Sequence, residues 1–80
     1  TSLNLHQDDF YDFTNSNFNM CELTGFVADP TPGGGKLIEN CIFNNCTNVT
    51  AQGLITGAYK FAGRSYTFRY NGIVYTVPAA

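Results

Sequence analysis

The residues of this sequence that could bind a cation lie near its N-terminus. His6 is the only histidine, and Asp8, Asp9 and Asp12 follow it closely. Imidazole nitrogen and carboxylate oxygen are both ligands for divalent metals. Their spacing does not match a calcium-binding loop, and clustered acids are typical of a solvated surface. We therefore interpret residues 1–10 as an acidic arm and predict no metal site.

Three cysteines, Cys21, Cys41 and Cys46, are the candidate nucleophiles. A catalytic thiolate needs a neighbouring base, usually histidine, and His6 is distant from all three along the chain. Structural zinc needs about four ligands at characteristic spacings, and no Cys-x-x-Cys pair occurs. An odd number also fits poorly with a disulfide framework. We interpret the thiols as reduced, buried and inert, with one disulfide plus a free thiol as the alternative.

Other catalytic patterns are incomplete. The run Gly33–Lys36 lacks the upstream glycine and the following Ser or Thr of a phosphate-binding loop, and no Gly-x-Ser-x-Gly motif occurs. Asp29 and Glu39 are the best candidates for a catalytic carboxylate pair. A chain of 80 residues, however, rarely builds both a cleft and its support. We predict no catalytic residue, no cofactor and no enzymatic activity.

Composition limits the class of partner. The net charge is −2, and charged residues make up only 12% of the chain. The four Lys and Arg residues are dispersed, so they do not form the basic patch that nucleic acid binding requires. No apolar run could cross a bilayer, and the N-terminus has neither the basic nor the apolar region of a signal peptide. We expect neither nucleic acid nor membrane as partner, and an initiator Met removed before Thr1.

A rhythm of five residues runs along much of the chain. Its units are Tyr11–Asn15, Ser16–Met20, Cys21–Gly25, Lys36–Asn40, Cys41–Asn45, Cys46–Thr50 and Ala51–Ile55. All three cysteines occupy the first position of a unit. Large apolar residues occupy the third position of five units, namely Phe13, Phe18, Leu23, Ile38 and Phe43. The prolines and glycines of residues 27–35 predict a loop that separates the two stretches.

This pattern resembles the pentapeptide-repeat family, whose units carry a small residue, Asp or Asn, Leu or Phe, Ser or Thr, and then any residue. The similarity is clear over 11–25 and 41–45 and loose over 36–40 and 46–55. The resemblance implies a right-handed, four-sided β-helix of about two coils, in which the first and third positions point inward. A generic parallel β-helix is the alternative.

The chain departs from the family pattern at four positions. Asn48 and Gly53 stand where Leu or Phe belongs, and Tyr11 and Lys36 stand where a small residue belongs. A coil of this kind buries its inward side chains only against the turns above and below, so its ends need caps. We therefore expect the coils to be covered by the C-terminal part of the chain, by a partner, or by both.

The C-terminal part carries a strong hairpin signal. Asn71-Gly72 favours a two-residue type I′ turn, because both turn positions require positive φ. The resulting register pairs Tyr70 with Ile73, Phe68 with Tyr75 and Tyr66 with Val77 on one face, and places Thr67, Arg69, Val74 and Thr76 on the other. Ala62-Gly63 predicts a turn from an earlier strand, 56–61, onto the same sheet. Pro78 would end this three-stranded meander.

Aromatic and aliphatic residues outside the repeats are the candidate partner-binding residues. They are Leu3, Leu5, Phe10, Tyr59, Phe61, Tyr66, Phe68, Tyr70 and Tyr75. Tyrosine in particular is favoured at interfaces. The alternative is that the aromatic face packs on the coils as ordinary core, which a small domain needs.

Together these patterns predict one all-β domain over residues 1–80. It comprises the arm 1–10, coil-like repeats over 11–55 with the loop 27–35, and an antiparallel β-meander over 56–78. A sandwich or barrel is the alternative fold.

For function we expect a non-enzymatic structural or assembly protein, such as a phage capsid cement or decoration subunit. It would dock on its own copies or on capsid or tail proteins in the virion. A cytoplasmic location is the alternative. Two other functions stay open: a protein-binding inhibitor of the pentapeptide-repeat type, and a small carbohydrate-binding or hydrolase domain.

Overall fold

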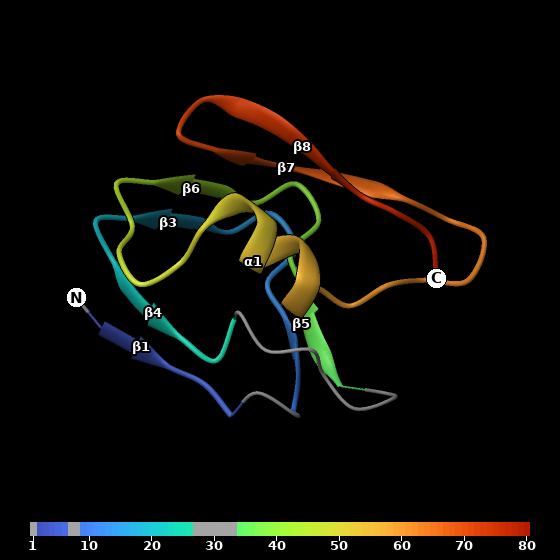
Figure 1. The fold of residues 1–80 in the computed structure, drawn as a ribbon, viewed down its shortest axis with the longest axis horizontal. Helices are drawn as coiled ribbons and strands as arrows, with labels where there is room; N and C mark the ends of the chain where they lie inside the picture. Colours follow the sequence, from blue (N-terminus) through green and yellow to red (C-terminus); the bar gives the residue numbers. More distant parts are fainter. Residues whose placement is uncertain (1, 7–8, 27–33) are drawn as a thin grey trace.

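Short strands dominate the fold (Figure 1). The structure is a computed structural model that describes residues 2–6, 9–26 and 34–80. In chain order the elements are β1 (Ser2–Asn4), β2 (Phe10–Asp12), β3 (Asn17–Asn19), β4 (Glu22–Thr24), β5 (Gly35–Leu37), β6 (Ile42–Asn44), α1 (Ala51–Gly57), β7 (Tyr66–Tyr70) and β8 (Ile73–Val77). The chain is therefore β-rich, as predicted, with one short helix among the described residues.

Six of the strands form three parallel pairs that follow chain order. β1 pairs with β4, β2 with β5 and β3 with β6. The central residues mark the register, with Leu3 beside Leu23, Tyr11 beside Lys36 and Phe18 beside Phe43. We call β1, β2 and β3 the first layer, and β4, β5 and β6 the second layer. The predicted arm thus contains a paired strand, β1, and the first residue of β2.

Sharp corners between the strands recur every five residues. Positive φ angles occur at Asn15, Met20 and Gly25, and again at Asn40 and Asn45. Glycine adopts this left-handed region at no steric cost, and asparagine tolerates it better than other residues. The corners also contact one another across the layers, because the Asn40 Nδ2 donates to Asn15 Oδ1 over 2.7 Å. The fifth position of the first five units therefore turns the chain.

The corner at Gly25 also fixes the N-terminal segment. A Cβ atom there would lie 2.2 Å from the carbonyl oxygen of Leu5, so only glycine fits. The backbone N–H of Leu5 in turn donates to the carbonyl of Thr24 over 3.1 Å. This close approach docks the segment after β1 against the end of β4.

The core lies between the layers. Its fully buried members include Leu23, Ile38, Phe43, Phe68 and Val77. The ring of Phe43 stacks on Phe18 at 4.8 Å and meets the ring of Phe68 edge-on at 6.0 Å. Aromatic pairs at these separations add to the stabilisation from burial alone. The third positions of the five-residue units thus supply two of the aromatic core residues, Phe18 and Phe43, and Phe68 of the hairpin packs against them.

The C-terminal hairpin continues one of the parallel pairs into a four-stranded sheet. Its strand order is β3-β6-β7-β8, with β7 parallel to β6 and β8 antiparallel to β7. The predicted register is confirmed, because Tyr66 pairs with Val77, Phe68 with Tyr75 and Tyr70 with Ile73. The turn is also as predicted, since Asn71 and Gly72 have φ angles of 50° and 82°.

The predicted third strand of the meander, 56–61, is wrong. Residues 56 and 57 end α1 instead, and β6 takes the place beside β7. The predicted coil unit Ala51–Ile55 is also wrong, because these residues form the rest of α1. Thr50 caps the helix, because its side chain accepts from the backbone N–H of Gly53 over 3.0 Å. At the other end, Lys60 Nζ donates to the carbonyl of Ile55 over 2.9 Å. The segment after the helix keeps only isolated bridges, one of them between Lys36 and Ala58.

The predicted loop 27–35 lies outside the described residues at 27–33. Its last residue, Gly35, is not part of a loop but begins β5 and pairs with Phe10. A Cβ on Gly35 would lie 3.1 Å from the Tyr59 backbone, so the missing side chain lets that backbone pass close by. Composition alone could not distinguish this glycine from the two glycines before it.

Candidate functional site

The N-terminal acids do not gather into a metal site among the described residues. His6 Nδ1 lies 4.0 Å from Asp9 Oδ1, and Asp8 falls outside the described residues. Asp12 accepts from the hydroxyl and backbone N–H of Thr14, at 2.7 and 3.0 Å, which lowers the pKa of its carboxyl. No three His, Cys, Asp or Glu side chains lie close enough to share an ion in residues 2–6, 9–26 and 34–80.

Lys36 has a structural position that the sequence did not reveal. Its side chain is fully buried, and Nζ donates to the carbonyls of His6, at 2.8 Å, and Asp9, at 3.3 Å. The ammonium also lies 5.5 Å from the centre of the Tyr11 ring. A buried ammonium needs such partners, because desolvation without them is costly. Lys36 therefore links the backbone at His6 and at Asp9 to β5.

The three thiols are free and each points at backbone carbonyls. Cys41 Sγ lies 2.8 Å from the carbonyl oxygen of Phe13, and Cys46 Sγ lies 3.4 Å from that of Phe18. Cys41 is buried, whereas Cys21 and Cys46 are partly exposed. Burial raises the pKa of the Cys41 thiol to about 11, so it stays protonated at neutral pH.

The carboxylate pair considered from the sequence is not formed among the described residues. Asp29 lies outside them. Glu39 accepts a hydrogen bond from Arg64 over 2.9 Å, in an exposed ion pair. The Arg64 guanidinium also lies 4.1 Å from the centre of the Phe61 ring. Glu39 thus has a surface ion-pairing position.

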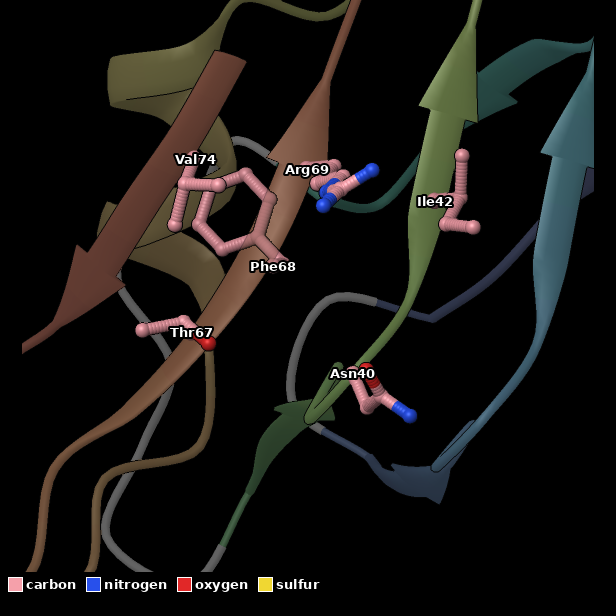
Figure 2. A pocket seen from close by; sticks show the side chains of 6 residues that line it. All are labelled: Asn40, Ile42, Thr67, Phe68, Arg69 and Val74. Carbon is pink, nitrogen blue, oxygen red and sulfur yellow. The ribbon is translucent and has the colours of Figure 1, made fainter. Parts of the chain in front are cut away.

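A hollow of about 230 Å³ lies on the outer face of the four-stranded sheet (Figure 2). Its lining residues are Asn40, Ile42, Thr67, Phe68, Arg69 and Val74. Arg69 is the register partner of Ile42 on one side and of Val74 on the other. Its guanidinium has no hydrogen-bond or ion-pair partner in the part of the chain that the structure describes. The hollow could therefore receive a carboxylate between two aliphatic side chains.

The candidate partner-binding aromatics fall into two groups in the structure. Phe10 meets Tyr59 edge-on at 5.0 Å, and Tyr59 meets Phe61 in the same way. The second group centres on Tyr75, whose ring lies 5.8 Å from Phe68 and 6.4 Å from Tyr70.

Burial separates these aromatics into core and surface. Tyr66 and Phe68 are buried, and the Tyr66 hydroxyl donates to the carbonyl of Tyr59. Phe10 is 47% exposed, whereas Tyr59, Phe61, Tyr70 and Tyr75 are partly exposed. Leu3 and Leu5 are partly buried against the core. Of the nine candidates, Phe10 offers the most surface to a partner.

One end of the layered strands is less well covered than the other. In two of the three central register pairs the first-layer residue is more exposed than its second-layer partner: Leu3 and Tyr11 are partly exposed, whereas Leu23 and Lys36 are fully buried. In the third pair both Phe18 and Phe43 are buried. Phe13 is likewise partly exposed. We call the outer side of β1, β2 and β3 the open end. Apolar side chains are accessible there because no further described layer covers them.

The strand edges at the open end are also unpaired. β1, β2 and β3 each stand at the end of their strand order among the described residues. β8 stands at the opposite edge of the four-stranded sheet. Unpaired N–H and C=O groups along an edge are a template for another strand. Two opposite sides of the molecule can therefore accept one.

Among the described residues four large apolar side chains are well exposed, and of these only Phe10 was a predicted partner-binding residue. Met20 is 69% exposed at a first-layer corner, and Ile73 and Val74, at 57% and 55%, belong to β8. Two signals could have identified them. Met20 takes the corner position that four other units give to Asn or Gly, and Val74 is an apolar residue on the otherwise polar hairpin face.

No family model, curated protein or solved structure matches this chain. No helix among the described residues is long and apolar enough to cross a membrane.

Proposed function

We propose that this chain is a non-enzymatic structural protein that docks on other protein subunits through its open end. The observation that carries the proposal is the difference in side-chain exposure between the first layer and the second layer. Leu3 is partly exposed, whereas its register partner Leu23, of the same residue type, is fully buried. Apolar surface left in contact with water is a source of binding free energy, and a covering subunit would remove it from water.

We further propose that the paired layers form a short, irregular β-helix of about two coils, of the kind implied by the pentapeptide-repeat resemblance. Parallel register pairs lie 20 residues apart between β1 and β4, which equals four five-residue units. They lie 25 residues apart between β3 and β6. Corners at every fifth residue support the same arrangement. The α1 helix and the hairpin then end the coils at one side only.

Assembly in a virion, as a capsid cement or decoration subunit, is the context we propose. Small size, few charges and unpaired strand edges on two sides suit a subunit that is completed by its neighbours. Detection of the chain in purified virus particles by peptide mass spectrometry would support this context. Its recovery only from particle-free cytoplasm would contradict it.

Sedimentation velocity on the full chain, under reducing conditions at micromolar concentration, tests the docking. We expect wild-type protein to associate. The Leu3→Glu variant, which puts a charge at the open end, should associate less, whereas Ser65→Glu, with a charge at an exposed position away from it, should behave as wild type. Circular dichroism checks that both variants fold. A wild-type monomer that unfolds cooperatively would overturn the proposal.

A further inference from the structure

We propose that the subunit covering the open end is a second copy of this chain, and that β8 of one copy adds to β3 of the next. The proposal rests on the docking function proposed above and names its partner. The result is a head-to-tail, heterologous contact in which the four-stranded sheet continues from copy to copy.

The free edge of β3 presents two residues to a partner strand. The carbonyl of Ser16 accepts from Ile42 over 3.0 Å, and the N–H of Met20 donates to Asn44 over 2.9 Å. Residues of a strand direct their hydrogen-bonding groups alternately to either side. Since 16 and 20 face β6, the backbone groups of Asn17 and Asn19 face the free side.

The free edge of β8 presents two residues with the same spacing. Tyr70 and Ile73 flank a two-residue turn, so they form the hydrogen-bonded pair that closes the hairpin. Alternation then directs the backbone groups of Val74 and Thr76 away from β7. Asn17 and Asn19 of one copy can therefore pair with Thr76 and Val74 of another.

Strand direction brings the exposed apolar residues of the two edges together. β8 runs antiparallel to β7, which is parallel to β6, which is parallel to β3. When a copy adds in the same orientation, its β3 lies antiparallel to the first copy's β8. Met20, just after β3, then lies beside Ile73 and Val74 at the start of β8. Three of the four exposed large apolar residues are buried by one contact.

Charge favours this head-to-tail contact over a symmetric one. Asp9 and Asp12 lie at the first layer, and Asp12 stays ionised because Thr14 donates to it. Lys60, Arg64 and Arg69 all lie beyond the second layer, on the side of α1 and the hairpin. Contact between two open ends would bring the acids of both copies together, and contact between two hairpin sides would bring their cations together. Head-to-tail contact brings the acidic side of one copy toward the basic side of the next instead.

Two edge variants and their mixture test the proposal. Asn19→Pro removes an N–H from the free edge of β3, and Thr76→Pro does the same on β8, while neither N–H is needed within the chain. Asn19→Ala and Thr76→Ala are the matched controls, because they keep the N–H. Sedimentation velocity should show oligomers for wild type and both alanine variants, and monomers for each proline variant alone. An equimolar mixture of the proline variants should form dimers, since one intact interface remains between them.

Each other outcome has a defined meaning. A monomeric wild type overturns both this proposal and the docking function. If wild type and both proline variants all associate, the docking function stands and the β3–β8 contact is wrong. If only one proline variant is monomeric, the contact is symmetric and the proposal is overturned. If a proline variant loses its folded circular dichroism spectrum, the mixing experiment uses Met20→Lys and Val74→Glu in place of the two proline variants. Each of these alone should associate weakly, and their mixture should restore association.

Discussion

At the scale of single residues, the left-handed corners explain why asparagine is so frequent in this chain. Asn15, Asn40 and Asn45 all have positive φ, and Asn40 donates to Asn15 from one layer to the next. The side chain thus satisfies a backbone requirement and a contact between layers. Met20 occupies the same kind of corner with a φ of 55° but has neither advantage. Backbone strain of this kind often coincides with function, which agrees with the contact proposed for Met20.

Replacing Met20 by asparagine should stabilise the folded monomer. The left-handed conformation costs an ordinary residue about 1 kcal/mol, and asparagine tolerates it better. We expect the free energy of unfolding of Met20→Asn to rise by up to about 1 kcal/mol in urea titrations on dilute protein. Met20→Ala is the control, since it removes the exposed side chain but keeps the strain. Equal stability of the two variants would show that the corner is unstrained.

The buried thiol should make the chain sensitive to alkali. The pKa of Cys41 is about 11 in the folded protein against 9.0 when unperturbed, so the unfolded chain loses this proton first. The stabilisation is therefore complete below pH 9 and is lost as the pH rises to about 11. Burial also raises the pKa of Tyr66, which acts in the same direction.

Urea titrations at a series of alkaline pH values would measure this loss. Cys41→Ser keeps a donor for the Phe13 carbonyl without the thiol's ionisation. We expect its free energy of unfolding to fall less steeply from pH 9 to 11 than that of wild type. Cys21→Ser, at a partly exposed thiol, is the control and should follow the wild-type curve. Identical slopes for wild type and Cys41→Ser would contradict the prediction.

At the scale of elements, α1 is held at both ends by side-chain hydrogen bonds. The Thr50 side chain accepts from Gly53, and Lys60 donates to the carbonyls of Ile55 and Ala58 at the other end. Lysine near a helix C-terminus also interacts favourably with the helix dipole. Leu54 anchors the helix in the core, where it is fully buried. The helix therefore closes the side of the core that β7 does not reach.

Removing the cap should weaken the helix and expose its first turn. Thr50→Ala should lower the free energy of unfolding by about 1 kcal/mol, because the Gly53 N–H loses its acceptor. Amide hydrogen exchange at Gly53 should quicken in the same variant. Gln52→Ala, at an exposed helix position with no capping contact, is the control. Unchanged exchange at Gly53 in Thr50→Ala would mean that the cap does not hold this turn.

At the scale of the whole molecule, the core is covered less well on the first-layer side than on the opposite side. The hairpin and α1 cover the later side, whereas the first layer faces outward with unpaired edges among the described residues. The acids Asp9 and Asp12 lie at the same side as these edges. Both proposals depend on this asymmetry, because a core covered at both ends would need no neighbour.

Substitutions at two leucines in register can measure this difference in coverage. Leu3 and Leu23 are the same residue type on paired strands, one layer apart. Leu23→Ala should cost about 2–5 kcal/mol, as expected for a fully buried leucine. Leu3→Ala should cost less than half as much in dilute monomer, because its side chain still contacts water there. Urea titration measures both, and equal losses would show that the open end is as well covered as the core.

Several features were predictable because they depend on neighbours in sequence. The hairpin register followed from Asn71-Gly72 and the alternation on either side of it, and the structure has the same pairs. The seven aromatic candidates for partner binding came from the sequence, but it did not predict that only Tyr66 and Phe68 among them are buried.

Other features depend on contacts distant in sequence and could not be predicted. Lys36 stands where the repeat pattern has a small residue. Its burial depends on the carbonyls of His6 and Asp9, which accept from its ammonium and lie 30 and 27 residues earlier in the sequence. Residues 56–61 have the alternation of a strand, but β6 already occupies the edge of β7 that this strand would need. Competition for one edge is decided by the whole fold, which local pattern does not describe.

The sequence by itself determined the β-rich class, the hairpin, and a five-residue spacing of apolar and corner residues, because these follow from local backbone preference and side-chain alternation. Only the tertiary structure decided which layer stays uncovered, which edges stay free, and where the charges lie relative to them. The reason is physical: exposure and edge pairing are properties of how segments stack, and the same strands stacked in another order would leave a different surface for a neighbour.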